Sequence, residues 1–425
     1  MKTPELLAPA GTLRNLRYAL AYGADAVYAG MPRYSLRVRN NDFSTLERLA
    51  EGIALTHAQG KRFFLTSNLL PHNAKLKTFL TDLEPVLELG PDALIMADPG
   101  LIMLVRERWP ELPVHLSVQA NTMNHAAVRF WERLGIRRII LSRELSLDEV
   151  EEIRNQCPEV ELEVFVHGAL CIAYSGRCLL SGYFNHRDAN QGSCTNACRW
   201  SYQVHEARPD ESGDLQPATR ISLLEEAERP GELMPVEEDE HGTYIMNSRD
   251  LRAVEHVERL VRIGVDSLKI EGRTKSHYYV ARTTQVYRRA IDDALAGRPF
   301  DPRLLGSLDN LANRGYTDGF FQRHHHQAYQ NYLASRSESV RQRFVGELSG
   351  YDADSGLAQV EVKNKFATGD ELELILPGGN RRFRLQTLLD RQGRPLAEAP
   401  GGGHQVCIPL PPGDYAMGLL ARTLP

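Results

Sequence analysis

Short apolar runs alternate with amphipathic stretches along the first two thirds of the chain. The amphipathic stretches, such as residues 44–59, 75–89, 125–134, 250–263 and 278–295, carry apolar residues at about every third or fourth position, which is helical spacing. Alternating strands and helices pair in parallel through right-handed crossovers, so eight such units predict a closed (β/α)8, TIM-like barrel. The eight apolar runs are residues 5–9, 26–30, 62–68, 93–98, 114–120, 137–142, 162–168 and 267–272.

A doubly wound open sheet is the alternative arrangement for the same pattern. Its dinucleotide-binding form carries a G-x-G-x-x-G turn after the first strand. The corresponding turn here reads PAGTL. The sequence therefore favours the barrel and gives no support to a Rossmann-type site.

The regular spacing breaks after the seventh run, which predicts an insertion of about residues 169–242. The insertion contains a cysteine-rich segment followed by a polar, acidic surface stretch. Residues 1–330 would form the barrel with this insertion, and residues 331–344 a connector. From residue 345 to residue 425 the pattern changes to short alternating strands with Gly, Pro and Asp turns, which predicts a small antiparallel β-barrel.

Composition agrees with a folded globular protein of two domains. The 425 residues are 42% hydrophobic and 25% charged, and a chain of this length exceeds the usual single core. The N-terminal residues do not resemble a secretory signal, and no apolar run reaches the length of about 18 residues that spans a bilayer. We therefore expect a cytoplasmic protein without a membrane partner. The net charge of −5 neither predicts nor excludes a nucleic-acid partner, because a local basic face binds a polyanion.

Four of the six cysteines, Cys171, Cys178, Cys194 and Cys198, follow the pattern C-x6-C-x15-C-x3-C. Clustered cysteines in the cytoplasm are more often metal ligands or catalytic thiols than disulfides. Zinc sites usually pair ligands about two to four residues apart. The long irregular gaps favour a 4Fe-4S cluster, with zinc and then unlinked thiols as the alternatives. Four thiolates would saturate such a cluster, which leaves electron transfer, structural support or a labile ligand as its roles.

Polar residues gather where the predicted strands end, and a barrel places its catalytic mouth there. Each alone could be a helix cap or an ion-pair member, but together they indicate a pocket. The set comprises Tyr28, Arg37, Asn68, Asp98, Gln119, Asn121, Arg143, Glu144, His167, Lys269, Glu271 and Arg273.

The run KIEGR places Lys269 and Glu271 on one face of a strand. The two could form an ion pair. Alternatively, Glu271 could act as a general acid or base while Lys269, Arg273 and Arg37 bind an anionic substrate. His167 could ligate a metal, shuttle protons or be an ordinary buried imidazole.

Peptidase activity is a weaker hypothesis for the same cysteine and histidine residues. The sequence has no G-x-S-x-G elbow and no H-E-x-x-H motif. A thiol bound to iron is also not a free nucleophile.

Several motifs together resemble the collagenase-like peptidase family of unknown catalytic type. They are PELLAPAG, GADAVYAG, SLRVRNNDF, HGALC-x-AYSGRC, NQG-x-C-x3-C-R and SLKIEGR-x-KS-x-YYVA, and they cover nearly the whole chain. The C-terminal β-barrel matches the members of this family that modify tRNA. The resemblance implies oxygen-independent 5-hydroxylation of the wobble uridine in tRNA, with prephenate as the hydroxyl donor.

The resemblance also implies a 4Fe-4S cluster held by four cysteines. Cys171, Cys178 and Cys194 fall on the shared motif, and Cys198 is the fourth candidate because no cysteine lies between it and Cys407. Prephenate is a dicarboxylate, which suits the guanidinium groups of Arg37, Arg143 and Arg273 and the ammonium group of Lys269. Glu271 or His167 would move protons, and Asn68, Gln119 and Asn121 would complete the substrate site.

A tRNA partner, bound through its anticodon region, requires a basic surface with aromatic side chains for stacking. Such a surface on or near the small barrel is supplied by Arg336, Arg341, Arg343 and the arginines of the run NRRFR (380–384), with Tyr329 and Tyr332 close by. The alternative role of that barrel is a structural appendage. Two alternative hypotheses for the function of the whole chain remain, a peptidase and a non-catalytic iron-sulfur accessory protein.

Overall fold

The computed structural model describes residues 2–36, 41–171, 173–178, 181, 194–195, 249–313, 315–322 and 342–424, together with the backbone of short strands between residues 206 and 243. These short strands form three antiparallel pairs in the predicted insertion. They are β8 (Glu206–Pro209), β9 (Leu215–Ala218), β10 (Leu223–Glu225), β11 (Leu233–Pro235), β12 (Glu238–Asp239) and β13 (Gly242–Thr243).

Eight parallel strands form a closed barrel, which confirms the predicted TIM-like fold. Consecutive strands pair along the ring, and the last strand closes it by pairing with both the first and the seventh. All eight predicted strands are present. They are β1 (Glu5–Pro9), β2 (Ala26–Gly30), β3 (Arg62–Ser67), β4 (Ala93–Met96), β5 (Val114–Leu116), β6 (Arg138–Ile140), β7 (Glu161–Ala169) and β15 (Ser267–Ile270).

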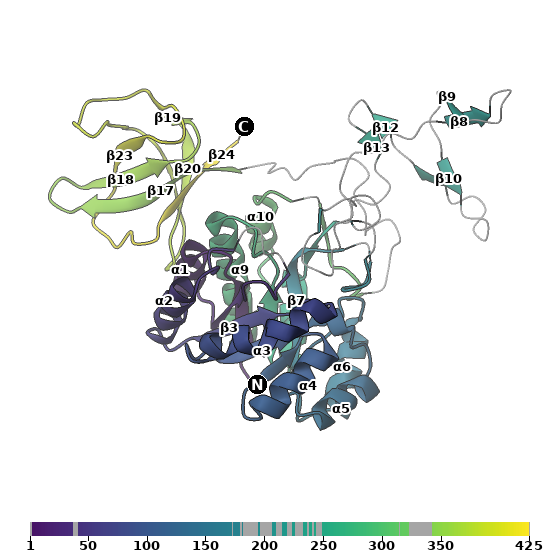
Figure 1. Cartoon of the computed structure of the whole chain (residues 1–425). Coiled ribbons are helices and arrows are strands. Elements are labelled where there is room, and N and C mark those ends of the chain that lie inside the picture. The colour runs from purple at the N-terminus through teal and green to yellow at the C-terminus, as the bar shows by residue number, and fades with distance from the viewer. Residues whose placement is uncertain are drawn as a thin grey trace.

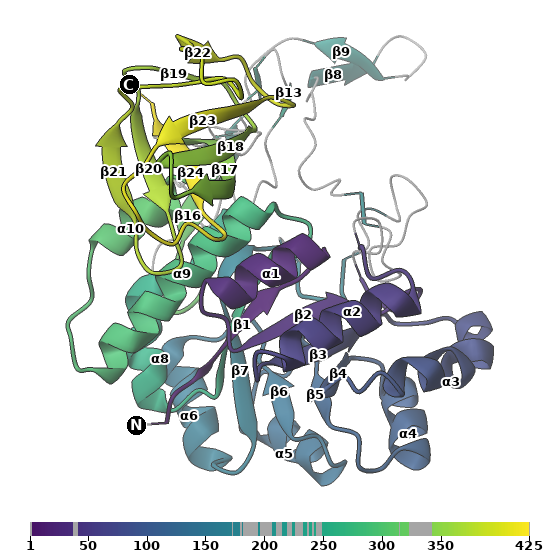
Figure 2. The ribbon, with the colours of Figure 1, turned by 90° about the vertical axis from the view of Figure 1, so that its left-hand side faces the viewer.

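Helices surround this barrel (Figures 1 and 2). Most begin at a Ser, Thr, Asp or Asn whose side chain accepts a backbone N–H of the first turn, which satisfies a donor that the helix itself cannot. The helices are α1 (Leu13–Ala21), α2 (Leu46–His57), α3 (Asn73–Leu87), α4 (Pro99–Arg108), α5 (His125–Arg133), α6 (Leu147–Gln156), α8 (Val257–Ile263), α9 (His277–Leu295) and α10 (Arg303–Asp309). Within the described residues, no helix has the length and apolar character needed to cross a membrane.

The predicted helix over 250–263 is wrong in its first half. Strand β14 (Asp250–Arg252) and the short 3-10 helix η5 (Val254–His256) precede α8. Strand β14 pairs antiparallel with the last residues of β7, His167 to Ala169, and in parallel with β16 (Tyr316–Thr317). Strand β7 extends past its neighbour β6, so its end would expose unpaired backbone groups, and β14 satisfies them.

The C-terminal region forms an antiparallel β domain, as predicted. Its six-stranded sheet has a core of its own. The outermost named strands of this sheet are β21 and β23, and an antiparallel bridge joins Leu389, in the chain that follows β21, to Cys407 of β23. The sheet order is β21 (Arg381–Arg384), β20 (Glu371–Ile375), β24 (Leu419–Thr423), β17 (Gln342–Asp352), β18 (Leu357–Val362) and β23 (Gln405–Pro409), and β19 (Phe366–Ala367) pairs with β22 (Glu398–Ala399).

This domain packs against α1 and α9 (Figure 1). Tyr22, at the end of α1, donates its hydroxyl hydrogen bond to the carbonyl oxygens of Ile375 and Met417, at 2.9 Å each. Arg282 of α9 pairs with Glu373 of β20, with 2.9 Å between Nη1 and Oε1. The C-terminal domain is therefore fixed to the helix that directly follows β15.

Candidate active site at the barrel mouth

Arg143 and Glu271 meet at the mouth, where β6 and β15 end. Arg143 Nη2 lies 3.5 Å from Glu271 Oε2, and the side chains are 12% and 22% exposed. The guanidinium carbon lies 3.9 Å from the centre of the Phe165 ring, and Nη1 donates to the carbonyl oxygen of Ala169 at 3.3 Å. A planar cation held over an aromatic ring beside a carboxylate is suited to bind an anionic ligand and to transfer a proton near it.

Lys269 lies inside the barrel and is 2% exposed. Its Nζ donates to Glu163 Oε1 at 2.8 Å and lies 4.5 Å from the centre of the Tyr28 ring. Burial lowers the pKa of Lys269, and the negative charge of Glu163 opposes that shift. Of the two roles that the sequence left open, the structure gives Lys269 the ion pair, but with Glu163 in place of Glu271.

A charged network continues from this pair to the amino-terminal end of the barrel. Arg138 Nη1 lies 3.4 Å from Glu163 Oε2 and 2.5 Å from Glu5 Oε1. Burial raises the pKa of Glu5, although Arg138 opposes the shift. The strand-end pattern did not predict a role for Glu5, Arg138 or Glu163. The signal that could have found them is a charged residue within the apolar strand runs that contain Glu5, Arg138 and Glu163.

Arg273 is buried and engages protein partners with both terminal nitrogens. Its Nη1 donates to Ser35 Oγ at 3.0 Å and Thr66 Oγ1 at 2.7 Å, and its Nη2 donates to the Leu36 carbonyl at 2.7 Å. These contacts fix the backbone that leads into Arg37, which lies outside the described residues. The structure thus shows Arg273 holding the loop after β2.

The predicted amide residues connect neighbouring strand ends. Asn68 Oδ1 accepts from the Leu36 N–H at 3.3 Å, and its Nδ2 lies 3.4 Å from Ser117 Oγ. Gln119 lies in the short 3-10 helix η2 (Val118–Ala120) after β5. Asn121 ends that helix, and its Nδ2 donates to the Ser175 carbonyl at 2.7 Å. The ends of β3 and β5 are thereby joined to the loop after β2 and to the cysteine segment.

His167 is enclosed by tyrosines and is 1% exposed. Its ring centroid lies 5.8 Å from that of Tyr279, 5.5 Å from Tyr287 and 5.4 Å from Tyr316. Burial lowers the pKa of His167 to about 3, so the imidazole is neutral at physiological pH. This environment favours the ordinary buried imidazole among the three roles considered for His167.

The cysteine segment leaves the barrel directly after β7. Cys171 is exposed, and Cys178 and Cys194 are half-buried. Ser181 Oγ accepts from the Thr195 N–H at 2.9 Å, which ties the chain after Cys178 to the chain beside Cys194. Among the described residues, no three Cys, His, Asp or Glu side chains lie close enough to hold a metal ion, and Cys198 is outside that set. The donor chemistry of the three described thiols fits an iron-sulfur cluster or zinc.

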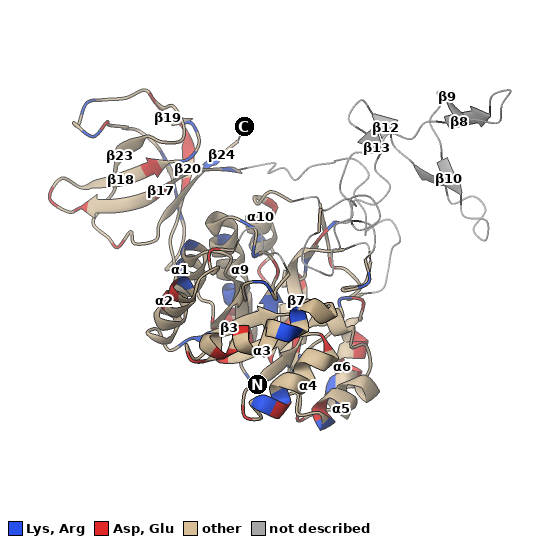
Figure 3. Ribbon diagram, viewed as in Figure 1, with Lys and Arg blue, Asp and Glu red and all other residues tan. Residues whose placement is uncertain are grey.

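The predicted tRNA-binding arginines lie partly outside the described residues, as do Tyr329 and Tyr332. Arg343, Arg381, Arg382 and Arg384 are exposed on the C-terminal domain. In the sheet register Arg382 faces Glu373 and Arg384 faces Glu371, which reduces the local positive charge. Figure 3 colours basic positions blue and acidic positions red along the ribbon, and both kinds occur in the barrel and in the C-terminal domain.

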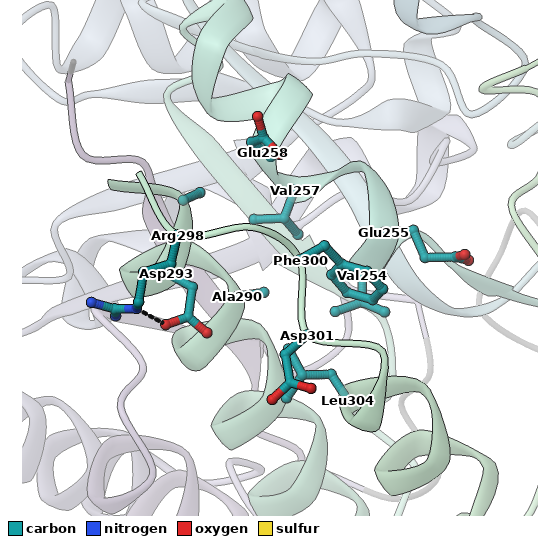
Figure 4. A pocket seen from close by; sticks show the side chains of 11 residues that line it. Val254, Glu255, Val257, Glu258, Ala290, Asp293, Arg298, Phe300, Asp301 and Leu304 are labelled. Atoms are coloured by element: carbon teal, nitrogen blue, oxygen red, sulfur yellow. Dashed lines mark hydrogen bonds and ion pairs between the residues drawn. The ribbon is translucent and has the colours of Figure 1, made fainter. Parts of the chain in front are cut away.

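A shallow hollow lies away from the mouth, between η5, α8, α9 and the chain that leads to α10 (Figure 4). Apolar side chains such as Val254 and Phe300 line it. Arg298 Nε lies 2.5 Å from Asp293 Oδ1, and Arg289 Nε lies 2.9 Å from Oδ2. Because both carboxylate oxygens of Asp293 are paired, we assign Asp293 a structural role.

Residues 11–331 match the model of peptidase family U32, and residues 340–422 match the model of the peptidase family U32 C-terminal domain. The chain therefore belongs to peptidase family U32, and the family resemblance expected from the motifs is confirmed.

Among its relatives, the "tRNA hydroxylation protein P" of Escherichia coli (strain K12) is 60% identical over 430 residues, which covers 97% of this chain and 94% of that protein. The protein of the same name from Haemophilus influenzae is 56% identical over 446 residues, which covers 99% of this chain and 96% of that protein. The solved structure of "the U32 Peptidase Mk0906" is 15% identical with a TM-score of 0.40, and the match covers 64% of this chain and 94% of that one.

Proposed function

We propose that this chain is an enzyme that hydroxylates tRNA. The observation that carries the proposal is its 60% identity to a protein named for tRNA hydroxylation, over 97% of this chain and therefore over both domains. The charged, partly open mouth of the barrel is the natural place for such chemistry.

The finer proposal is oxygen-independent 5-hydroxylation of the wobble uridine, with prephenate as the hydroxyl donor. Arg143 would bind a carboxylate of prephenate, and Arg37, directly after the anchored Leu36, would bind the other. A substrate carboxylate at Arg143 would compete with Glu271 for this guanidinium group, and a less strongly paired Glu271 would be a better proton acceptor. Lys269 and Arg273 would support the site through their protein partners.

We further propose that Cys171, Cys178, Cys194 and Cys198 hold a 4Fe-4S cluster, with zinc as the alternative. The chemistry of the four thiols and the position of Cys171 directly after β7 support this assignment. When bound, such a cluster would supply electron transfer or a labile ligand beside the mouth.

The exposed arginines of β21 and Arg343 are the candidate contacts for tRNA outside the mouth, with the anticodon loop at the mouth itself. A peptidase built on the cysteine segment has less support. His167 is the histidine nearest to Cys171 in sequence, but its pKa of about 3 and its tyrosine surroundings make it a poor base for activating a thiol.

The test is mass spectrometry of tRNA nucleosides from a strain that lacks this protein and any redundant hydroxylase. The wild-type gene should restore 5-hydroxyuridine derivatives, whereas Arg143→Ala and Glu271→Gln should restore less than a tenth of that level. An exposed ion-pair substitution on α8, Arg262→Ala, is the matched control and should restore the full level. Undiminished 5-hydroxyuridine in the deletion strain would contradict the proposal.

A separate experiment addresses the cluster. Anaerobically purified protein should contain iron and sulfide and absorb in the visible range, and Cys194→Ala should lose most of both. A colourless, zinc-containing protein would overturn the cluster but leave the tRNA proposal standing.

A further inference from the structure

The turn midway between Cys171 and Cys178 is attached to the barrel by the end of β5. The Arg177 N–H donates to the Tyr174 carbonyl at 3.1 Å and closes this turn. Asn121 Nδ2 donates to the Ser175 carbonyl inside the turn at 2.7 Å. A side chain from a different strand end thus reaches the backbone between two of the cysteines.

The backbone of Asn121 is suited to this contact. Its φ of 51° and ψ of 54° lie in the left-handed region, which asparagine adopts at lower cost than most residues. Its N–H donates to the Val118 carbonyl at 3.0 Å, so the residue is fixed before its side chain reaches the turn. A side chain held in this way positions its partner better than a mobile surface residue would.

The turn also packs closely against Gln119. Gly176 has a φ of +72°, and a Cβ atom there would lie 2.8 Å from Gln119 Oε1 and 3.0 Å from its carbonyl oxygen. A side chain at this position would be strained by the left-handed backbone and would crowd the carbonyl oxygen of Gln119. The turn therefore has two attachments to the η2 segment that follows β5, a hydrogen bond at Ser175 and a close contact at Gly176.

We propose that Asn121 is a positioning residue that fixes the turn 173–177 and thereby sets the separation of Cys171 and Cys178 as ligands. The start of the segment is fixed independently, because Ala169 of β7 pairs with Asp250 of β14. With both the strand end and the turn held, the chain on each side of the turn delivers one thiol. This inference rests on the proposed metal-ligand role of the cysteines.

The test compares two substitutions that remove the amide donor in different ways. Asn121→Gly keeps the left-handed backbone accessible, and Asn121→Asp keeps the shape but places a carboxylate against the Ser175 carbonyl. The matched control is Asn124→Ala, which removes only the cap at the start of α5, where Asn124 Oδ1 accepts from the Ala127 N–H at 2.9 Å.

Hydrogen exchange of the Arg177 amide should become at least tenfold faster in both Asn121 variants and stay unchanged in Asn124→Ala. A competing chelator should remove iron at least threefold faster from both variants. Unchanged exchange, or faster exchange with unchanged iron release, would overturn the proposal. Gly176→Ala provides a second route, because the added methyl group should displace the same turn and give the same two changes.

If the wild-type protein holds no cluster, the proposed cofactor fails, and the positioning role is decided in the metal-free protein. In a fixed thiol redox buffer, the fraction of Cys171–Cys178 disulfide, located by peptide mass spectrometry, should then differ at least threefold between the Asn121 variants and the wild type. An equal fraction in all of them would overturn the positioning role.

Discussion

Lys269 Nζ lies 2.8 Å from Glu163 Oε1 in the interior of the barrel, and neither residue is more than 2% exposed. Arg138 contacts the other oxygen of Glu163 at 3.4 Å. Lys269 and Arg138 therefore both pair with the carboxylate of Glu163, which has almost no access to water. Arg138 also pairs with Glu5. Buried charges persist only when they are paired in this way.

Replacement of Lys269 by Met should destabilise the fold by about 3 to 5 kcal/mol, because it leaves Glu163 buried with one cation less. The second substitution Glu163→Gln, added to Lys269→Met, should restore part of this stability because the uncompensated charge is gone. The measurement is the free energy of unfolding from denaturant titration.

The exposed pair Arg262 and Glu258 on α8 provides the control, since Arg262→Ala should change the free energy of unfolding by less than about 0.5 kcal/mol. Equal stability of Lys269→Met and the wild type would show that the charge network is not required for the fold.

Substitutions around Arg273 distinguish a loop anchor from a direct substrate ligand. Thr66→Val and Ser35→Ala each remove one acceptor of Arg273 Nη1 and leave its charge intact. If Arg273 acts by holding the loop after β2, each should lower tRNA hydroxylation severalfold, and Arg273→Lys should lower it more, because ammonium cannot replace the planar fork. The readout is the 5-hydroxyuridine content of tRNA in the complemented deletion strain.

The control for this series is Thr45→Ser, at the start of α2, which keeps the capping hydroxyl and lies outside the Arg273 contacts. Full activity of both Thr66→Val and Ser35→Ala, together with loss in Arg273→Lys, would instead identify Arg273 as a residue whose planar guanidinium group contacts the substrate directly.

The barrel could be predicted from the sequence because each strand is a short apolar run between stretches of helical spacing. The error at 250–256 has a clear cause. Leu251, Val254 and Val257 have a spacing that a helix would bury, but the end of β7 required a hydrogen-bonding partner, and this requirement is a property of the assembled sheet. Local periodicity does not contain that information.

The position of the polar residues at the strand ends was also predictable, but their partners were not. Strand alternation places Lys269 and Glu271 on the same face, yet Lys269 pairs across to β7 and Glu271 pairs with Arg143. Pairing across a barrel depends on the register between strands, which one sequence does not specify. For the same reason the pairing of Glu5 with Arg138 was not predicted from the sequence.

Arg282 and Glu373 provide a test of how the two domains are held together. They are 1% and 4% exposed. Burial alone would raise the pKa of Glu373, but Arg282 and a hydrogen bond from Gln342 outweigh it and the pKa is lowered. Arg282→Met would leave this carboxylate with only neutral hydrogen-bond donors, so we expect a loss of about 3 kcal/mol or more and a C-terminal domain that separates from α9.

Limited proteolysis should then release a fragment that begins near residue 340 at lower protease concentration than in the wild type. Glu371→Gln, an exposed change on the same strand β20, is the matched control and should leave the cleavage pattern unchanged. Resistance of Arg282→Met equal to that of the wild type would mean that the apolar contacts alone dock the domain.

The pH dependence of stability should reveal the buried state of His167. Its pKa is lowered to about 3 by burial, whereas an exposed histidine titrates near 6.5, so protons bind the unfolded chain preferentially. The stabilising contribution of neutral His167 is thus complete above about pH 6.5 and is lost as the pH falls from there towards 3, at about 1.4 kcal/mol per pH unit.

His167→Gln should remove this component, so the free energy of unfolding should fall less steeply between pH 6 and about pH 4 than in the wild type. His404→Gln changes an exposed histidine of the C-terminal domain and should keep the wild-type slope. Identical slopes for His167→Gln and the wild type, measured by urea unfolding at each pH, would mean that His167 is protonated within the fold.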